Sequence, residues 1–286
     1  MAPNDSYGTL SGSNRAENGL SNGNGAGGEH GALLGKSNDE NSFMERSRRH
    51  MTADVNKTYG DLVLLFCYII TGLLDSSSVQ VWGSFVSMQT GNTVYFGLGL
   101  ANPSQANTRW IRAAISVASF CLGSFFFARY HRHLGARKRW VMVSAYALQI
   151  VMMVAAALMV TLGPVTGPSG SVSIWISIPI ALIAFQAAGQ AVTSRVLGYS
   201  GLTGVVLTSI YCDLFSDPKL FAPLRENVER NRRATAAFCV AVGALLGGLW
   251  APSEFGLPGA LWNAVGLKAL VIVAWFFWKA EAESSS

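Results

Sequence analysis

Residues 72–101 read GLLDSSSVQVWGSFVSMQTGNTVYFGLGLA, an apolar stretch that polar residues and glycines interrupt. A single acid, Asp75, stands inside it, and hydroxyl and amide side chains follow, together with Gly91, Gly97 and Gly99. In hydrocarbon, irregular backbone is stable only where protein covers it or where it lines a wet cavity. The stretch therefore predicts a broken or re-entrant segment, about 84–101, inside a bundle of membrane-spanning helices.

The remaining sequence agrees with a membrane protein. Of its 286 residues, 50% are hydrophobic and only 13% are charged, against about 25% charged in soluble domains. A helix needs about 20 apolar residues to cross a bilayer. Such segments lie at about 61–80, 110–129, 140–162, 173–195, 233–251 and 260–278. A second interrupted segment, about 200–215, is similar to the first.

The placement of basic residues favours six crossings over eight. The loop RYHRHLGARKR at 129–139 and the loop at 216–233 are both basic, whereas the loop at 163–173 has no charge. With six crossings, both basic loops, Lys279 and the N-terminal tail lie on one side, which the positive-inside rule predicts to be cytoplasmic. Arg109 and Arg112 are the exceptions, because this topology places them near the outer surface.

The two halves of the chain are related by a weak repeat. A shift of about 118 to 121 residues aligns Gly83 with Gly201, Thr90 with Thr208, and Gly123 with Gly243. Three crossings per half is an odd number, so the second copy must be inverted. The sequence thus predicts an all-α fold, a polytopic transmembrane helix bundle of about six spans plus two broken or re-entrant segments in two inverted repeats. The expected divisions are a disordered polar tail at 1–57, the repeats at 58–162 and 163–280, and a short polar C-terminus at 281–286.

The tail is rich in Gly, Asn and Ser and has no long apolar run, so it is expected to be disordered. Its GNGAGG run at 23–28 lacks the flanking strand and helix of a dinucleotide site. We therefore expect no cofactor. The basic run RSRRH at 46–50 is expected to hold this end of the chain in the cytoplasm.

The first interrupted segment carries a set of candidate solute-binding residues. Its glycines permit a tight bend, and its amides and hydroxyls offer hydrogen-bond donors and acceptors. The candidates are Gln89, Thr90, Gly91, Asn92 and Thr93. They form either a cradle for a small ligand or a packed turn whose side chains bind only its own backbone.

Asp75 and Lys268 are ionisable residues within predicted spans, and such residues mark candidate functional sites. If both face the interior they can pair, or Asp75 can carry a proton during transport. Alternatively, Asp75 is a polar latch on the re-entrant backbone and Lys268 snorkels to an interface. Gln80, on the same span as Asp75, is a further candidate.

The second half offers Gln186, Gln190 and Thr208 as candidates. The two glutamines are four residues apart and so lie on one helix face, where they line a polar path or join helices through hydrogen bonds of about 1 kcal/mol. Arg195 is expected to mark the cytoplasmic end of its helix. His131 and His133 are expected to be solvated surface residues, and the GxxxG pair Gly243 and Gly247 to pack helices closely.

Several functional classes find no support in the sequence. It has no HExxH, GxSxG or Walker motif, so we expect neither an enzyme nor a bound metal. Cysteines occur singly, at 67, 121, 212 and 239. Basic residues gather between apolar runs, which is unlike a nucleic-acid footprint. The expected partners are the lipid bilayer and a small-molecule solute, with homo-oligomerisation left open.

The runs at 72–101 and 189–209, the latter GQAVTSRVLGYSGLTGVVLTS, resemble the two signatures of the YoaK family, the DUF1275 membrane proteins of bacteria and fungi. The resemblance spans roughly residues 60–280, and the polar tail is similar to that of fungal members. It implies that Asp75, Thr90, Gly91 and Asn92 fall on the first signature and Gln190 and Thr208 on the second. Ala191 and Ser209 stand where the family pattern has Asn and Gly.

That family is known as one of polytopic membrane proteins of unassigned function, with transport suspected and some fungal members beside secondary-metabolite pathways. The leading hypothesis is a secondary transporter of a small polar or anionic organic solute, coupled to protons through Asp75. The alternatives are a membrane scaffold or accessory factor of a biosynthetic pathway, and a membrane-embedded enzyme.

Overall fold

The computed structural model describes residues 43–103, 108–164 and 172–281. The chain divides into two units, Met1–Arg46 and Ser47–Ser286. Most of the predicted tail, residues 1–42, lies outside the described residues. Secondary structure in the described part is helical apart from two isolated β-bridges, which confirms the all-α fold class.

Eight helices follow one another in the second unit. They are α2 (Gly60–Trp82), α3 (Gln89–Ala101), α4 (Arg109–Leu134), α5 (Arg139–Leu162), α6 (Ile174–Val196), α7 (Thr208–Phe215), α8 (Val228–Trp250) and α9 (Gly256–Phe277). Six of them, all except α3 and α7, are long and apolar enough to cross a membrane. The predicted number of spans is therefore confirmed for the described residues.

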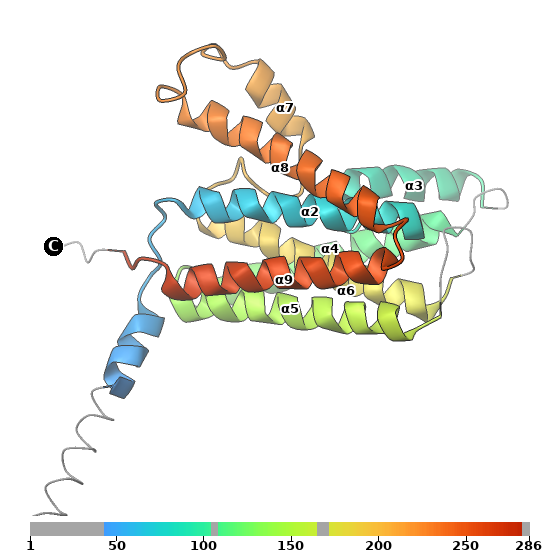
Figure 1. The fold of residues 1–286 in the computed structure, drawn as a ribbon, viewed down its shortest axis with the longest axis horizontal. Coiled ribbons are helices and arrows are strands. Elements are labelled where there is room, and N and C mark those ends of the chain that lie inside the picture. The colour runs from blue at the N-terminus through green and yellow to red at the C-terminus, as the bar shows by residue number, and fades with distance from the viewer. Residues whose placement is uncertain (1–42, 104–107, 165–171, 282–286) are drawn as a thin grey trace, which may run out of the picture. The chain divides into compact units, whose positions relative to one another are not determined.

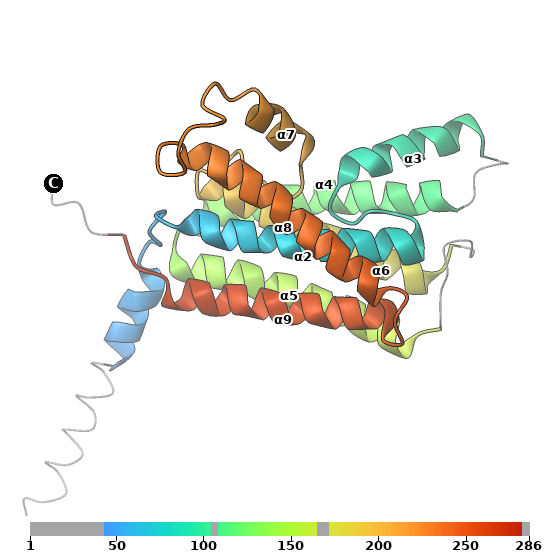
Figure 2. The same cartoon turned by 45° about the horizontal axis from the view of Figure 1, so that its top comes forward.

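The six long helices lie side by side in one bundle, and α8 crosses α2 at an angle (Figures 1 and 2). One end of the bundle, which we call the basic end, is where α2 and α8 begin and α9 ends. The other is called the far end. The short helices α3 and α7 lie towards opposite ends, α3 beside α4 and α7 beside α8.

The closest helix pairs join the two halves of the chain. Helix α4 of the first half packs on α6 of the second, and α8 of the second half packs on α2 of the first. A Cβ on Gly123 of α4 would lie 2.4 Å from the carbonyl oxygen of Phe185 in α6, and one on Gly243 of α8 would lie 2.1 Å from that of Ile69 in α2. Gly123 and Gly243, which the weak repeat aligns, thus each allow a close contact between a helix of one half and a helix of the other.

The GxxxG pair of α8 packs as expected. A Cβ on Gly247 would lie 2.5 Å from the carbonyl oxygen of Leu73, one turn along from the contact of Gly243 with Ile69. Both glycines therefore let the backbones of α2 and α8 approach each other directly.

Arg109 and Arg112 lie at the far end, against the positive-inside pattern, and the structure gives a reason. Arg112 Nη1 donates to the carbonyl oxygen of Trp82 at 2.9 Å, and Arg109 Nε donates to that of Gly83. These carbonyls end α2, where a helix has acceptors without intrahelical donors and a partial negative charge. The two arginines therefore cap α2.

The basic end joins three separate parts of the chain. Asp54 bridges to Lys138 and Val55 to Ala280, while Arg139 donates to the carbonyl oxygens of His50 and Trp278. Residues 43–52 are helical. The last residues of the segment assigned to the tail, from about 50 onward, are therefore bonded to the bundle.

His131 is not the solvated surface residue that the sequence predicted. It is 1% exposed, and its Nδ1 lies 3.1 Å from the carbonyl oxygen of Ala136. The error arose because α4 continues to Leu134, beyond the apolar segment, and brings His131 back against the following turn. His133, on the other side of the helix, is exposed as expected.

Candidate functional site

The first re-entrant segment enters and leaves the bundle at the far end. After α2 ends at Trp82, the backbone amides of Val86 and Ser87 donate to Asp75 Oδ1 at 2.8 Å, and that of Met88 donates to Oδ2 at 3.1 Å. Asp75 lies seven residues before the end of α2, about 10 Å along the axis. The tip of the segment, residues 84–88, is therefore about that far inside the bundle, and α3 leads back out.

Asp75 acts as a cap supplied by a different helix. The amides that precede and begin a helix lack acceptors of their own, and here both oxygens of the 3%-exposed carboxylate accept from them. This geometry is that of a latch on the re-entrant backbone, one of the two roles considered from the sequence.

The amides of Gln89 and Asn92 also serve the segment itself. Asn92 Oδ1 accepts from Ser84 Oγ and Phe85 N at 3.0 Å, while its Nδ2 donates to Phe85 O at 2.7 Å and to Gln89 Oε1 at 2.9 Å. Gln89 Nε2 donates to Val86 O at 3.1 Å. The polar groups of the tip are thus engaged by protein atoms.

The second re-entrant segment enters from the basic end. The segment follows the end of α6 at Val196. Within it, the carbonyl oxygen of Gly204 accepts a hydrogen bond from Thr71 Oγ1 of α2 at 2.7 Å. Thr71 lies eleven residues into α2, about 16 Å from the start of that helix. Gly204 has φ +76, and a Cβ there would lie 2.8 Å from Gln190 Nε2. The positive φ therefore favours glycine at this tip, and a Cβ would in addition displace the Gln190 amide.

The two tips meet the same face of α2. Thr71 and Asp75 are four residues apart, one helical turn or about 6 Å along the axis. One holds a carbonyl of the segment from the basic end, and the other holds amides of the segment from the far end. The two segments thus converge near the middle of the bundle, and we call this region the midplane site.

Lys268 is bound at the midplane site by two predicted residues of α6. It is 0% exposed, and its Nζ donates to Gln186 Oε1 and, at 3.4 Å, to Gln190 Oε1. Gln190 Nε2 in turn donates to Thr71 Oγ1 at 3.0 Å and to the carbonyl oxygen of Cys67 at 3.2 Å. Lys268 therefore does not snorkel to an interface, and the glutamines join α6 to α9 and α2.

Asp75 and Lys268 do not form the pair that was one of the alternatives considered from the sequence. The carboxylate is turned towards the tip of the first segment and the ammonium towards Gln186, and no ion pair joins them within the described ranges. The sequence indicated two charged groups at similar depth but carried no signal for the direction in which each points.

The remaining candidates lie at the edges of the site. Gly91 packs against the ring of Phe85, which a Cβ would approach to 2.6 Å. Exposed candidates are Gln80, Thr90, Thr93 and Thr208. Sequence analysis missed Thr71, Tyr146 and Ser116. Thr71 was detectable, because it is a hydroxyl one turn before Asp75, whereas Tyr146 and Ser116 resemble ordinary residues of an apolar span.

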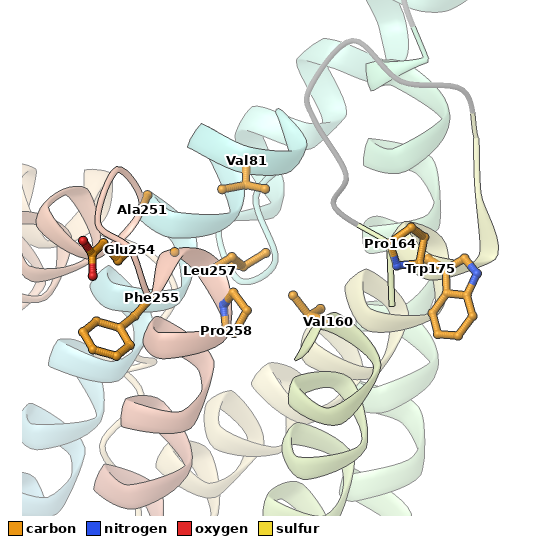
Figure 3. Close-up of a pocket in the computed structure, with 10 residues that line it drawn as sticks. Val81, Val160, Pro164, Trp175, Ala251, Glu254, Phe255, Leu257 and Pro258 are labelled. Carbon is orange, nitrogen blue, oxygen red and sulfur yellow. The ribbon is translucent and has the colours of Figure 1, made fainter. Parts of the chain in front are cut away.

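Open cavities lie at both ends of the bundle. At the far end, Val81, Val160, Leu257 and Pro258 surround a space of about 370 Å³ between α2, α5 and α9, with Glu254 beside it (Figure 3). At the basic end a space of about 380 Å³ is lined by Asn56, Thr58, Tyr59, Phe277, Trp278 and Lys279. Neither is lined by a candidate residue.

The fold and the midplane site define a polytopic membrane protein with two interrupted segments, one entering from each end of the helix bundle. The chain belongs to the family described as "Protein of unknown function (DUF1275)", whose family model matches residues 63–274. This confirms the DUF1275 resemblance. Searches of curated proteins and of solved structures found no match.

Proposed function

We propose that this membrane protein is a secondary transporter of a small polar or anionic organic solute. The observation that carries the proposal is the convergence of two re-entrant segments, one from each end, on adjacent turns of α2. Inverted repeats with interrupted helices at corresponding positions are a common architecture of secondary transporters, whose sites lie between the repeats at the midplane.

In this mechanism each tip closes one side of the midplane site. The tip at 84–88 separates the site from the far end, and the tip around Gly204 separates it from the basic end. Alternating access requires that one tip withdraw while the other stays bound to α2. The hydrogen bonds of Asp75 and of Thr71 are the contacts that break in these two movements.

Proton coupling is assigned to Asp75. The carboxylate accepts hydrogen bonds from the backbone amides of Val86, Ser87 and Met88. A proton on one of its oxygens makes that oxygen a donor, so at least one of these hydrogen bonds is lost. Protonation would therefore favour withdrawal of the first tip. The basic end is assigned to the cytoplasm, because both basic loops and Lys279 lie there.

The experiment compares thiol labelling at the two tips. In a background with all four native cysteines replaced by Ala, Ser87→Cys and Thr203→Cys are reconstituted separately in sealed liposomes and exposed to a membrane-impermeant maleimide under opposite pH gradients. A transporter predicts reciprocal changes, so that the gradient that raises labelling at 87 lowers it at 203. Leu224→Cys, in the exposed loop before α8, is the control and should label equally under both gradients.

Flux measurements separate transport from coupling. Across a broad solute panel, Asp75→Asn should abolish the dependence of uptake on an imposed pH gradient. Equal gradient-dependent flux in wild type and variant would remove the proton-coupling proposal and leave transport in place. Labelling that is constant at both tips, together with no flux, would remove transport.

A membrane scaffold or accessory factor is the second candidate. It is favoured by the internal use of the hydrogen bonds of Asp75, Gln89 and Asn92, which a purely structural segment also requires. In that case Asn92→Ala lowers stability and produces no separate transport defect. Neither candidate includes an enzymatic step.

A further inference from the structure

Lys268 is held far from water. It lies twelve residues after the start of α9 and nine before its end, about 18 Å and 14 Å along the axis, and it is 0% exposed. A cation at this depth is costly unless a negative group or strong dipoles compensate it. Its surroundings therefore decide what the site can bind.

The partners of Lys268 within the protein are neutral. Its Nζ donates to the amide oxygens of Gln186 and Gln190 and lies 5.7 Å from the centre of the Tyr146 ring. No carboxylate lies within 4.0 Å of it in the part of the chain that the structure describes. An ammonium has three donors, so one remains for a further acceptor.

A second polar side chain beside this group is also unengaged. Both amide atoms of Gln149 are buried without a hydrogen-bond partner, which is rare for a buried polar group. Gln149 is three residues after Tyr146 and so neighbours it on α5. A Cβ on Gly189, the residue before Gln190, would lie 2.8 Å from Gln149 Nε2. The unengaged amide therefore lies against α6 next to the glutamines that bind Lys268.

We infer that Lys268 and Gln149, positioned by Gln186 and Gln190, bind the carboxylate of a small organic monoanion. One uncompensated cation matches one negative charge, and the Gln149 amide supplies a further donor to the same anion. Tyr146 lies beside Lys268 and in turn contacts Cys67 and Trp275, so largely apolar side chains adjoin the site on this side. The inference rests on the proposed function and names the substrate class of its site.

The test measures ligand-induced thermal stabilisation of the full-length protein in detergent at constant ionic strength. The probes are acetate and benzoate, each paired with its neutral amide, acetamide and benzamide, and chloride as the inorganic anion. At least one carboxylate should stabilise the wild type while its amide does not. Lys268→Met should weaken the binding of that carboxylate about thirtyfold or more, because this is the loss expected when one partner of a buried charged pair is removed.

The control is Lys279→Met, which makes the same change in net charge at an exposed position of the basic end and should leave carboxylate binding unchanged. Lys268→Arg, which keeps the charge, should retain part of it. Gln149→Leu, which removes the unengaged amide, should weaken binding even where Lys268→Met does not fold.

Three results would overturn the inference: no stabilisation by either carboxylate, equal stabilisation of wild type and Lys268→Met, or stabilisation by chloride alone. Failure of transport is distinguishable from these. Binding of benzoate that depends on Lys268, without flux or reciprocal tip labelling, would leave the anion site in place and remove the transporter. Reciprocal labelling of the two tips without carboxylate binding would remove the anion site and leave the transporter in place.

Discussion

Asp75 organises the first re-entrant segment although it belongs to a spanning helix. Its two oxygens accept three backbone amides from residues 86–88. The repeat places residues 193–196 of α6 at the equivalent position, and none of them is acidic. The hydroxyls of Thr193 and Ser194 donate to carbonyl oxygens of their own helix. The second tip is instead held through Thr71 and the carbonyl oxygen of Gly204. The two halves therefore share an architecture but use opposite backbone groups at their tips.

Asp75→Asn should loosen the first tip. The substituted side chain keeps one acceptor oxygen and places donors against amides that are themselves donors, so the free energy of unfolding should fall by about 2–3 kcal/mol. Thermal unfolding in detergent measures this loss. Asp213→Asn, at an exposed position of α7, is the control and should be neutral. Equal midpoints for the two variants would contradict the capping role of Asp75.

Asp217 should make the loop before α8 sensitive to acid. The Asn227 side chain donates to its Oδ2 at 3.0 Å and Lys219 N to its Oδ1 at 2.8 Å, and these bonds lower the pKa of Asp217. A carboxyl whose pKa is lowered by folding stabilises the folded state above its unfolded pKa, about 3.9. That contribution is lost as pH falls through the folded pKa. Asn227 also caps α8 by accepting from Arg230 N.

The measurement is the difference in thermal midpoint between wild type and Asp217→Asn from pH 7 to pH 3. It should be constant near neutrality and shrink towards zero at the acid end. A difference that grows on acidification would contradict this account.

Individual residue types were predictable from sequence, but their partners were not. Lys268, Gln186 and Gln190 were all singled out as polar groups in apolar spans, and the structure brings them together. The partners of Asp75 are backbone amides, which every residue except proline carries, so no sequence pattern marks them. Their position depends on the turn at 83–88, which tertiary packing sets.

At the scale of helices, glycines bring the backbones of α2 and α8 into direct contact. A Cβ on Gly72 would lie 2.2 Å from the carbonyl oxygen of Val240, and one on Gly243 would lie 2.1 Å from that of Ile69. Both distances are to backbone atoms, so a rotamer change cannot relieve them. The contact therefore depends on hydrogen as the side chain at both positions.

Gly72→Ala and Gly243→Ala should each separate the two helices and lower stability by about 1–3 kcal/mol. Gly248→Ala is a matched control on α8, because a Cβ there meets nothing within 4 Å. It should be neutral or stabilise by about 0.5–1 kcal/mol through the helix preference of alanine. Thermal unfolding midpoints of the three variants in detergent measure these differences in stability. A loss of stability in Gly248→Ala equal to that of the other two would contradict the account.

Hydropathy predicted the existence of each span but not where each helix ends. Five of the six spans begin within four residues of their predicted starts, whereas α8 begins at Val228 and not near 233. Its first turn is charged and extends beyond the apolar run, with Asn227 as its cap. Within the interrupted segments the same limit holds, because apolarity does not show that 197–207 is non-helical and that α7 begins only at Thr208.

At the scale of the molecule, basic residues concentrate at one end of the bundle, and this asymmetry predicts its orientation. In cells that carry the protein in the plasma membrane, and with the native cysteines replaced, an impermeant maleimide should label Glu254→Cys at the far end. It should label Leu224→Cys at the basic end only after permeabilisation. The reverse pattern, or modification of the sequon Asn4-Asp5-Ser6, would contradict a cytoplasmic basic end.

The sequence was sufficient for the fold class, the number of spans and the DUF1275 family, because these follow from apolar length, charge placement and two local signatures. It was not sufficient for the chemistry of the midplane site. Whether Asp75 and Lys268 pair depends on helix rotation, and the apolar pattern of a buried helix such as α2 is too uniform to define which face points inward.

The hydrogen bonds and β-bridges at the basic end limit how the helices of this protein can move. Arg139 donates hydrogen bonds to the carbonyl oxygens of both His50 and Trp278. Two isolated β-bridges join Asp54 to Lys138 and Val55 to Ala280. The ends of α2, α5 and α9 that meet there are thus held together by these bonds. A rearrangement that exposes the interior on that side therefore has to move these three helices together or break the bonds that join them.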